Sequence, residues 1–183
     1  MATAFADVAP VTPPPLFARV MGSRFDRLPP MVRQLHSGAG TAVGAAEVVR
    51  GCHPLARMVA ALFGFPPAGS HRLRVSFATD AAGECWTRAF GRHRFSSRLG
   101  QQGAALVERF GPLRFAFDLI SEDAGLRMAM TGWSCAGVPM PMRLAPRTLA
   151  REWQQDGRFH FAVALALPLV GDVVAYSGWL RPE

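Results

Sequence analysis

An antiparallel hairpin is predicted most clearly by residues 147–167, RTLAREWQQDGRFHFAVALAL. Its centre, Asp156-Gly157, is typical of a two-residue type I′ turn, in which both central residues take positive φ. Such a turn pairs Glu152 with Phe161. Bulky residues alternate with alanines after the turn, and directly paired residues share one face of a sheet. We therefore expect Phe161 and Glu152 both to point inward.

The same period of two extends through most of the chain. Leu73, Val75 and Phe77 alternate with polar residues, and later segments repeat this pattern between hairpin signals. Short strands joined by tight turns indicate an antiparallel meander, because parallel strands need long crossovers. About nine such strands cannot lie flat in so short a chain, so we expect a mainly β (α+β) fold, either a strongly curved sheet or a β-barrel. The strands are expected at 41–50, 73–77, 86–90, 93–99, 104–110, 113–120, 126–135, 147–153, 159–167 and 173–180.

Two or three helices are expected in the N-terminal third of the chain. Short ones are predicted at 16–21 and 26–35, and the clearest begins at Pro54 and ends before Gly64. We expect this last helix to be covered on most sides and to plug or cover the sheet. An interfacial membrane helix is the alternative, but such helices carry many cations, and here the side opposite the bulky residues is mostly alanine. The bulky side consists of Leu55, Met58, Val59, Leu62 and Phe63.

The composition indicates one globular domain. The chain has 183 residues, 50% of them hydrophobic and 18% charged, which excludes collagen-like, coiled-coil and disordered proteins. We expect a single domain at 16–183, preceded by a flexible arm at 1–15 that ends in three prolines. All the cations counted in the net charge of +7 are arginines, a composition typical of GC-rich coding. The chain nevertheless keeps 13 Phe, although phenylalanine codons are AT-rich. Most of these Phe fall on the faces expected to be inside.

Location and partners are predicted mainly by what the sequence lacks. The first residues have no secretory signal pattern and no apolar run is long enough to span a bilayer, so we expect a cytoplasmic protein without a transmembrane segment. The three cysteines are widely spaced and expected to be free thiols. We expect no metal, no cofactor and no specific nucleic-acid partner, since phosphate-loop and ligand spacings are missing. The positive charge allows weak binding to anionic surfaces.

A polar cluster inside an aromatic cavity is the candidate site. Trp86 and Phe90 share a strand face with Arg88 and draw it inward. Glu152 is inward by the hairpin register, and Glu108 is inward in one register of its hairpin. In the competing register, one residue away, Glu108 pairs with an arginine outside. These charges either form ion pairs that fix the strand register, or act as acid and base, with Glu108 and Glu152 as candidate catalytic residues.

A ligand is expected to contact the aromatic side chains around that cluster. The candidate ligand-binding residues on strands are Trp86, Arg88, Phe115, Phe117, Phe159 and Phe161. The segment 137–142, GVPMPM, contributes Met140 and is followed by Arg143. Its prolines remove backbone donors and its methionines offer adaptable apolar surface, so it is expected either to form a lid with a cationic rim or to cap the core.

Several segments resemble a bacterial family known as domain of unknown function 4166. They are HPLARMVAALFGFPPAG at 53–69, ECWTRAFGRHRFSSRL at 84–99, VERFGPLRFAFDL at 107–119, the stretch 137–171, and YSGWL at 176–180. The resemblance runs from about residue 28 to the C-terminus. It implies no activity and no catalytic residue. Some family members are the C-terminal part of longer chains that look like NAD(P)-binding dehydrogenases.

Three functions follow as hypotheses. The first is a binding module that holds an apolar or amphipathic, lipid-like small molecule in a barrel. The second is an enzyme that uses Glu108 or Glu152 on a lipid-like or polyketide-like substrate in the same cavity. The third is an accessory domain that docks on a dehydrogenase-like partner, which an exposed apolar patch opposite the barrel mouth would favour.

Overall fold

The chain forms a closed antiparallel β-barrel. The computed structural model describes residues 13–80 and 83–183, so most of the expected arm at 1–15 lies outside the described residues. Strands β1 to β11 include all the segments predicted from the alternating pattern. Their bounds are β1 Gly40–Arg50, β2 Gly69–Asp80, β3 Gly83–Phe90, β4 His93–Gln102, β5 Ala105–Phe110, β6 Leu113–Glu122, β7 Gly125–Cys135, β8 Val138–Pro139, β9 Arg147–Gln155, β10 Arg158–Leu167 and β11 Gly171–Pro182.

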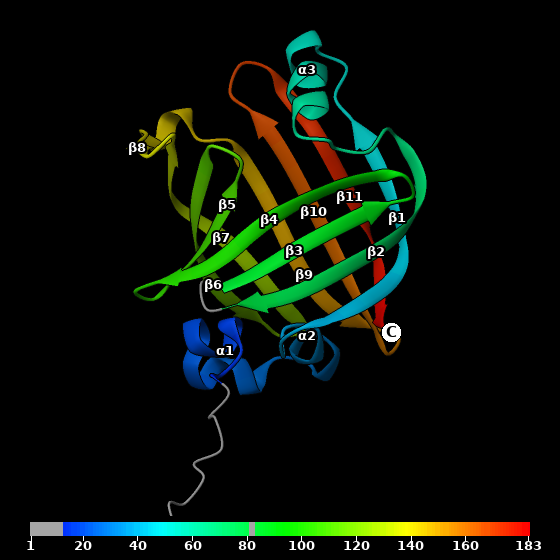
Figure 1. Cartoon of the computed structure of the whole chain (residues 1–183), viewed down its shortest axis with the longest axis vertical. Helices are drawn as coiled ribbons and strands as arrows, with labels where there is room; N and C mark the ends of the chain where they lie inside the picture. Colours follow the sequence, from blue (N-terminus) through cyan, green and yellow to red (C-terminus); the bar gives the residue numbers. More distant parts are fainter. Residues whose placement is uncertain (1–12, 81–82) are drawn as a thin grey trace, which may run out of the picture.

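The strands pair in the order β6-β5-β4-β3-β2-β1-β11-β10-β9-β7-β8, and β6 also pairs with β7. This last pairing closes the ring and leaves β8 as a short strand outside it (Figure 1). All the pairings are antiparallel, which confirms the mainly β meander. Of the two predicted forms, the chain adopts the barrel and not the open curved sheet.

The hairpin of β9 and β10 has the predicted register. Glu152 lies opposite Phe161. Asp156 and Gly157 have φ values of 50° and 69°, as a type I′ turn requires. Phe161 is buried with Glu152 in the barrel interior. The alternating pattern of the sequence therefore correctly predicted that the Glu152 carboxylate lies inside the barrel.

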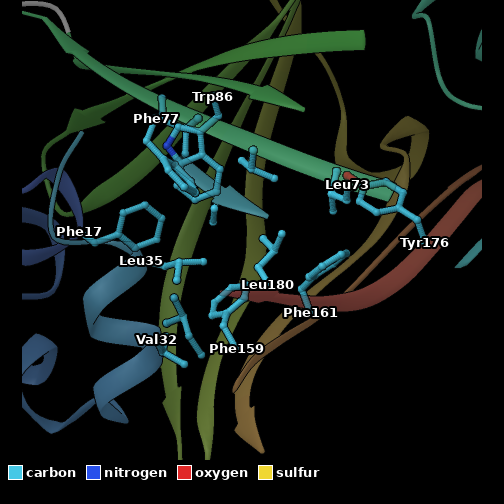
Figure 2. Packing of buried hydrophobic residues seen from close by; sticks show 14 of the residues in the cluster. Phe17, Val32, Leu35, Leu73, Phe77, Trp86, Phe159, Phe161, Tyr176 and Leu180 are labelled. Atoms are coloured by element: carbon cyan, nitrogen blue, oxygen red, sulfur yellow. The ribbon is translucent and has the colours of Figure 1, made fainter. Parts of the chain in front are cut away.

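The N-terminal helices lie at one end of the barrel (Figure 1). They are α1 Leu16–Met21, the 3₁₀ helix η1 Gly22–Arg27 and α2 Pro30–Leu35. Their buried side chains pack in one cluster with the strand residues. Figure 2 shows Phe17, Val32 and Leu35 facing Phe159 and Trp86 across this end. The helix predicted at 16–21 is confirmed, whereas the one predicted at 26–35 is shorter, because the chain is extended at Pro29 and α2 begins only at Pro30. Both helices lie beneath the interior.

The helix α3, Pro54–Leu62, has the predicted bounds but the opposite orientation. Its alanine side is buried, with Ala56 and Ala60 fully enclosed. The expectation of a covered helix is wrong, because Leu55, Met58 and Leu62 are 48%, 61% and 79% exposed. The alanines let the helix backbone pack closely against β11, whereas the larger side chains would hold it away. The helix lies outside, at the end of the barrel opposite α1 and α2 (Figure 1).

Candidate functional site

The barrel encloses a cavity in two connected parts. The larger has a volume of about 160 Å³ and the smaller about 50 Å³. Both are lined by Trp86, Arg88, Glu152, Val163 and Tyr176. The remaining lining is mostly aliphatic and aromatic, so a few polar groups stand in an apolar space.

The two parts of the cavity point to opposite ends of the barrel. The smaller part reaches Leu35 and His36 beside the N-terminal helices. The larger part reaches Val59 of α3 and the exposed Leu149. We call the α3 end of the cavity, where the exposed Leu149 lines it, the mouth, and the opposite end lies beside the N-terminal helices.

The predicted site residues on strands line the cavity from five strands. Trp86 and Arg88 come from β3, Phe115 and Phe117 from β6, and Phe159 and Phe161 from β10. All except Arg88 are buried, and each lines one or both parts. Glu108 on β5 and Glu152 on β9 complete the set.

Met140 and Arg143 are not among the residues that line either part of the cavity. Arg143 is exposed, in the 3₁₀ helix η2, Met142–Leu144. The preceding segment pairs with β7 as β8, outside the ring. Two prolines limit that pairing to two residues, and this short outer strand holds Met140 away from the interior.

Glu108 takes the inward register of its hairpin. It lies opposite Phe115, and Arg109 lies opposite Arg114. The sequence left this register open. Packing Leu106 into the core outweighs the unfavourable contact of the exposed Arg109 with the half-buried Arg114, since burial of a large apolar side chain is worth about 2 kcal/mol and charges near the surface interact weakly.

Arg88 connects the polar groups of the cavity. Its Nη1 donates a hydrogen bond to Ser97 Oγ at 3.0 Å, and its Nη2 lies 3.7 Å from Glu108 Oε1. The guanidinium carbon lies 5.3 Å from the ring centroid of Trp86 and 5.6 Å from that of Phe95. The charge is held between aromatic faces, which attract cations. The Glu108 side chain is 25% exposed and keeps room for a further partner.

Glu152 is held by a residue that the sequence analysis did not identify. His36 Nε2 and Glu152 Oε2 lie 2.5 Å apart in a hydrogen bond, and the His36 side chain is fully buried. The His36 ring stacks on Phe17 with centroids 3.7 Å apart, and its Nδ1 is buried without a partner. The signal was present in the helical spacing: His36 follows Val32 by four residues, on the inward side of α2.

Glu84 is a second buried carboxylate that the sequence analysis did not identify, although it lies two residues before Trp86 and therefore on the same strand face. It accepts a hydrogen bond from Trp86 Nε1 at 2.9 Å and one from the Leu16 backbone N–H at 3.3 Å. It therefore joins α1 to β3 and fixes the orientation of the Trp86 ring. This residue supports the cavity wall without lining the cavity.

Tyr176 is the one tyrosine of the chain and faces the centre of the cavity. Burial raises the pKa of its phenol to about 12, with a smaller opposing effect of Arg88 and a smaller reinforcing effect of Glu108. The cause is that a phenolate loses its hydration in the barrel interior.

We expect the phenol of Tyr176 to titrate with a midpoint near pH 12, which is measured as tyrosinate absorbance at 295 nm. The unfolded chain loses this proton near pH 10. Between these values the folded state holds one more proton than the unfolded state, so stability falls as pH rises, by about 1.4 kcal/mol per pH unit. Tyr176→Phe should remove both the absorbance change and this contribution to the slope. A midpoint at pH 10 in the folded protein would contradict the buried placement.

Three further features are absent from the described residues: a cluster of metal ligands, a membrane-spanning helix and a disulfide bond. Among residues 13–80 and 83–183, no three His, Cys, Asp or Glu side chains lie close enough to hold a metal ion. No helix in the same residues has the length and apolar character needed to cross a bilayer. Cys52, Cys85 and Cys135 are free thiols.

The fold and the site define a closed antiparallel β-barrel with an internal, largely apolar cavity. The family model "Domain of unknown function (DUF4166)" matches residues 28–180, and the chain belongs to this family. No curated protein matches the chain.

One similar solved structure is a crystal structure of a protein of unknown function from the DUF3598 family of Nostoc punctiforme. It has 13% sequence identity and a TM-score of 0.47, and the match covers 79% of this chain. The chain spans about half the length of that protein, 47%.

Proposed function

We propose that this protein is a binding module for an apolar or amphipathic small molecule. The observation that carries the proposal is the interior cavity of about 160 Å³, which is lined mainly by apolar side chains and extends to the mouth. A small closed barrel of this kind has room for one ligand. Dry apolar cavities bind apolar molecules, since the ligand gains contacts that water cannot make there.

The cavity volume indicates the size of the bound group. An engineered cavity of about 150 Å³ holds one benzene molecule. The larger part of the cavity therefore fits one ring or a short alkyl segment. A longer chain would continue through the mouth, past Val59 and Leu149. This arrangement favours a molecule with its polar end at the centre of the barrel and its apolar end toward the surface.

The charges around the cavity indicate the chemistry of that polar end. Arg88 is the one arginine among the lining residues, and Glu108 and Glu152 both line the larger part. An anionic head group would meet two carboxylates, whereas a hydroxyl or carbonyl oxygen can accept a hydrogen bond from Arg88 and leave Glu108 in place. The two carboxylates would repel an anionic head group, so the site selects neutral ligands over anionic ones. We therefore propose a ligand with a neutral oxygen.

Displacement of the neutral fluorescent probe N-phenyl-1-naphthylamine tests this proposal, because its phenyl ring fits the larger part of the cavity while its naphthyl group extends through the mouth. We expect the protein, purified without detergent, to bind the probe, and decan-1-ol to displace it at a concentration at least roughly tenfold below that of decanoate, a difference of about 1.4 kcal/mol. Arg88→Leu is expected to reduce the affinity for decan-1-ol. An absence of probe binding would refute the cavity as a ligand site, and stronger displacement by decanoate would refute the neutral head group.

An enzyme that uses the same cavity is the second candidate. The observation that favours it is the half-open carboxylate of Glu108, which faces the larger part of the cavity, whereas Glu152 is already bound to His36. A carboxylate in this position is suited to remove a proton next to a carbonyl. Deuterium exchange into 2-decalone in D₂O tests this: catalysed exchange that Glu108→Gln abolishes would support the enzyme, and exchange at the uncatalysed rate would exclude this reaction.

A further inference from the structure

Large apolar side chains are exposed together around the mouth. They come from three segments that Figure 1 places at the same end of the barrel: α3, the segment of β8 and η2, and the connection between β10 and β11. We call these side chains the apolar rim. It consists of Leu55, Met58, Leu62, Met142, Leu144 and Leu169, each at least 48% exposed.

The conformation of Leu169 sets this residue apart. It is fully exposed and has a φ of 63°, in the left-handed region. This conformation costs about 1 kcal/mol for a residue with a Cβ, so glycine or asparagine is the usual choice there. A leucine at this position stabilises neither the turn nor the core. Strain of this kind occurs at sites that serve binding.

The charge around the apolar rim is positive. The segments 53–64, 142–147 and 167–172 contain Arg57, Arg143 and Arg147, one histidine, and Asp172 as the only acid. The three arginines are exposed. Arg57 lies between Leu55 and Met58 on α3, and Arg143 lies between Met142 and Leu144. Arginine stems can lie along apolar surface while the guanidinium groups reach phosphates.

We propose that the apolar rim docks on an anionic phospholipid bilayer, with the mouth facing the membrane. Interfacial helices insert bulky side chains below the headgroups and keep cations at phosphate level. α3 exposes Leu55, Met58 and Leu62 with its alanine side fixed to the barrel, and Arg57 supplies a cation together with Arg143 and Arg147 of the neighbouring segment. The arginines complement the negative surface of such a bilayer. An apolar ligand then passes between the bilayer and the cavity without crossing water.

The shape of the rim favours a bilayer over a protein partner. The exposed side chains stand on separate protruding segments, and one of them, Leu169, is the middle residue of the turn at 168–170. A lipid bilayer can deform around each protruding side chain separately, whereas a protein interface buries a contiguous, closely complementary patch. The docking proposal does not depend on the identity of the ligand, because binding to vesicles and binding of a probe in solution are separate measurements.

Flotation with vesicles tests the docking proposal on the whole chain. We expect the protein to float with vesicles of phosphatidylcholine and phosphatidylglycerol, and to do so at least tenfold less well with phosphatidylcholine alone or at high salt. The variant Met58→Ser/Leu62→Ser/Leu169→Asn is expected to lose at least tenfold in partitioning. Arg57→Gln/Arg143→Gln should lose binding to anionic vesicles, whereas Arg27→Gln/Arg181→Gln, a charge-matched control on exposed residues outside the rim segments, should keep it.

Two outcomes would overturn the docking proposal. One is equal partitioning of the wild-type protein and the rim variants, with circular dichroism melts showing that all of them are folded. The other is a wild-type protein that does not bind vesicles but self-associates, while the rim variants are monomeric. That result would make the apolar rim an interface between protein chains. Probe binding in vesicle-free solution can succeed in either case, so failure of docking is distinguishable from failure of the proposed function.

Discussion

Ala150→Phe is expected to abolish binding of N-phenyl-1-naphthylamine while the protein stays folded. Ala150 lies opposite Val163 and lines the larger part of the cavity. A phenyl ring is about the size of the benzene molecule that a 150 Å³ cavity holds, so the new side chain should fill the space of about 160 Å³. Filling a cavity adds contacts, and we expect the melting temperature to stay unchanged or rise.

The matched control for this substitution is Ala162→Phe. Ala162 belongs to the same hairpin, but it lies opposite Arg151 and Ser177 on the outer face. The same ring added there leaves the cavity open, so probe affinity should be that of the wild-type protein. The measurement is a fluorescence titration of all three proteins. Probe binding by Ala150→Phe at wild-type affinity would show that the probe binds elsewhere.

His36→Leu is expected to destabilise the protein by about 3–5 kcal/mol, because it leaves the carboxylate of Glu152 buried without its partner. For a chain of this length, that corresponds to a fall in melting temperature of roughly 10 °C. His36 also stacks on Phe17, and its ring centroid lies 5.4 Å from that of Trp86. The substitution therefore loosens the packing at the end of the barrel beside α1 and α2. Thermal denaturation monitored by circular dichroism measures the effect.

A double substitution separates the charge from the packing. In His36→Leu/Glu152→Leu no unpaired carboxyl group remains, and replacement of both partners of a buried hydrogen bond by apolar residues is often nearly neutral. We expect the double variant to be more stable than His36→Leu alone. A change in melting temperature of less than about 2 °C for His36→Leu would show that the pair of His36 and Glu152 does not stabilise the end of the barrel beside α1 and α2.

The strands were predictable because a residue's face follows directly from the period of two. The type I′ signal at Asp156-Gly157 fixed the register around Glu152 and Phe161, and both proved correct. The register at Glu108 was not predictable. Two pairings one residue apart satisfied the local pattern, and the choice depended on the packing of Leu106 against residues distant in the sequence.

The helix α3 shows where a hydrophobic pattern gives the wrong answer. Its two sides, one bulky and one of alanines, are both apolar, so the pattern alone did not determine which side is buried. Close approach to β11 selected Ala56 and Ala60, and it turned the bulky residues outward. His36 was missed for a related reason. Its partner Glu152 lies 116 residues away, and only the closed barrel brings the two together.

Diffraction from crystals grown with 10-bromodecan-1-ol tests the account most directly. The bromine is located by its anomalous signal, and the hydroxyl by the electron density connected to it. We expect one molecule with its hydroxyl within hydrogen-bonding distance of Arg88 and its chain directed past Val59 to the mouth. An empty cavity, or a molecule bound only at the apolar rim, would contradict the claim that this barrel holds its ligand inside.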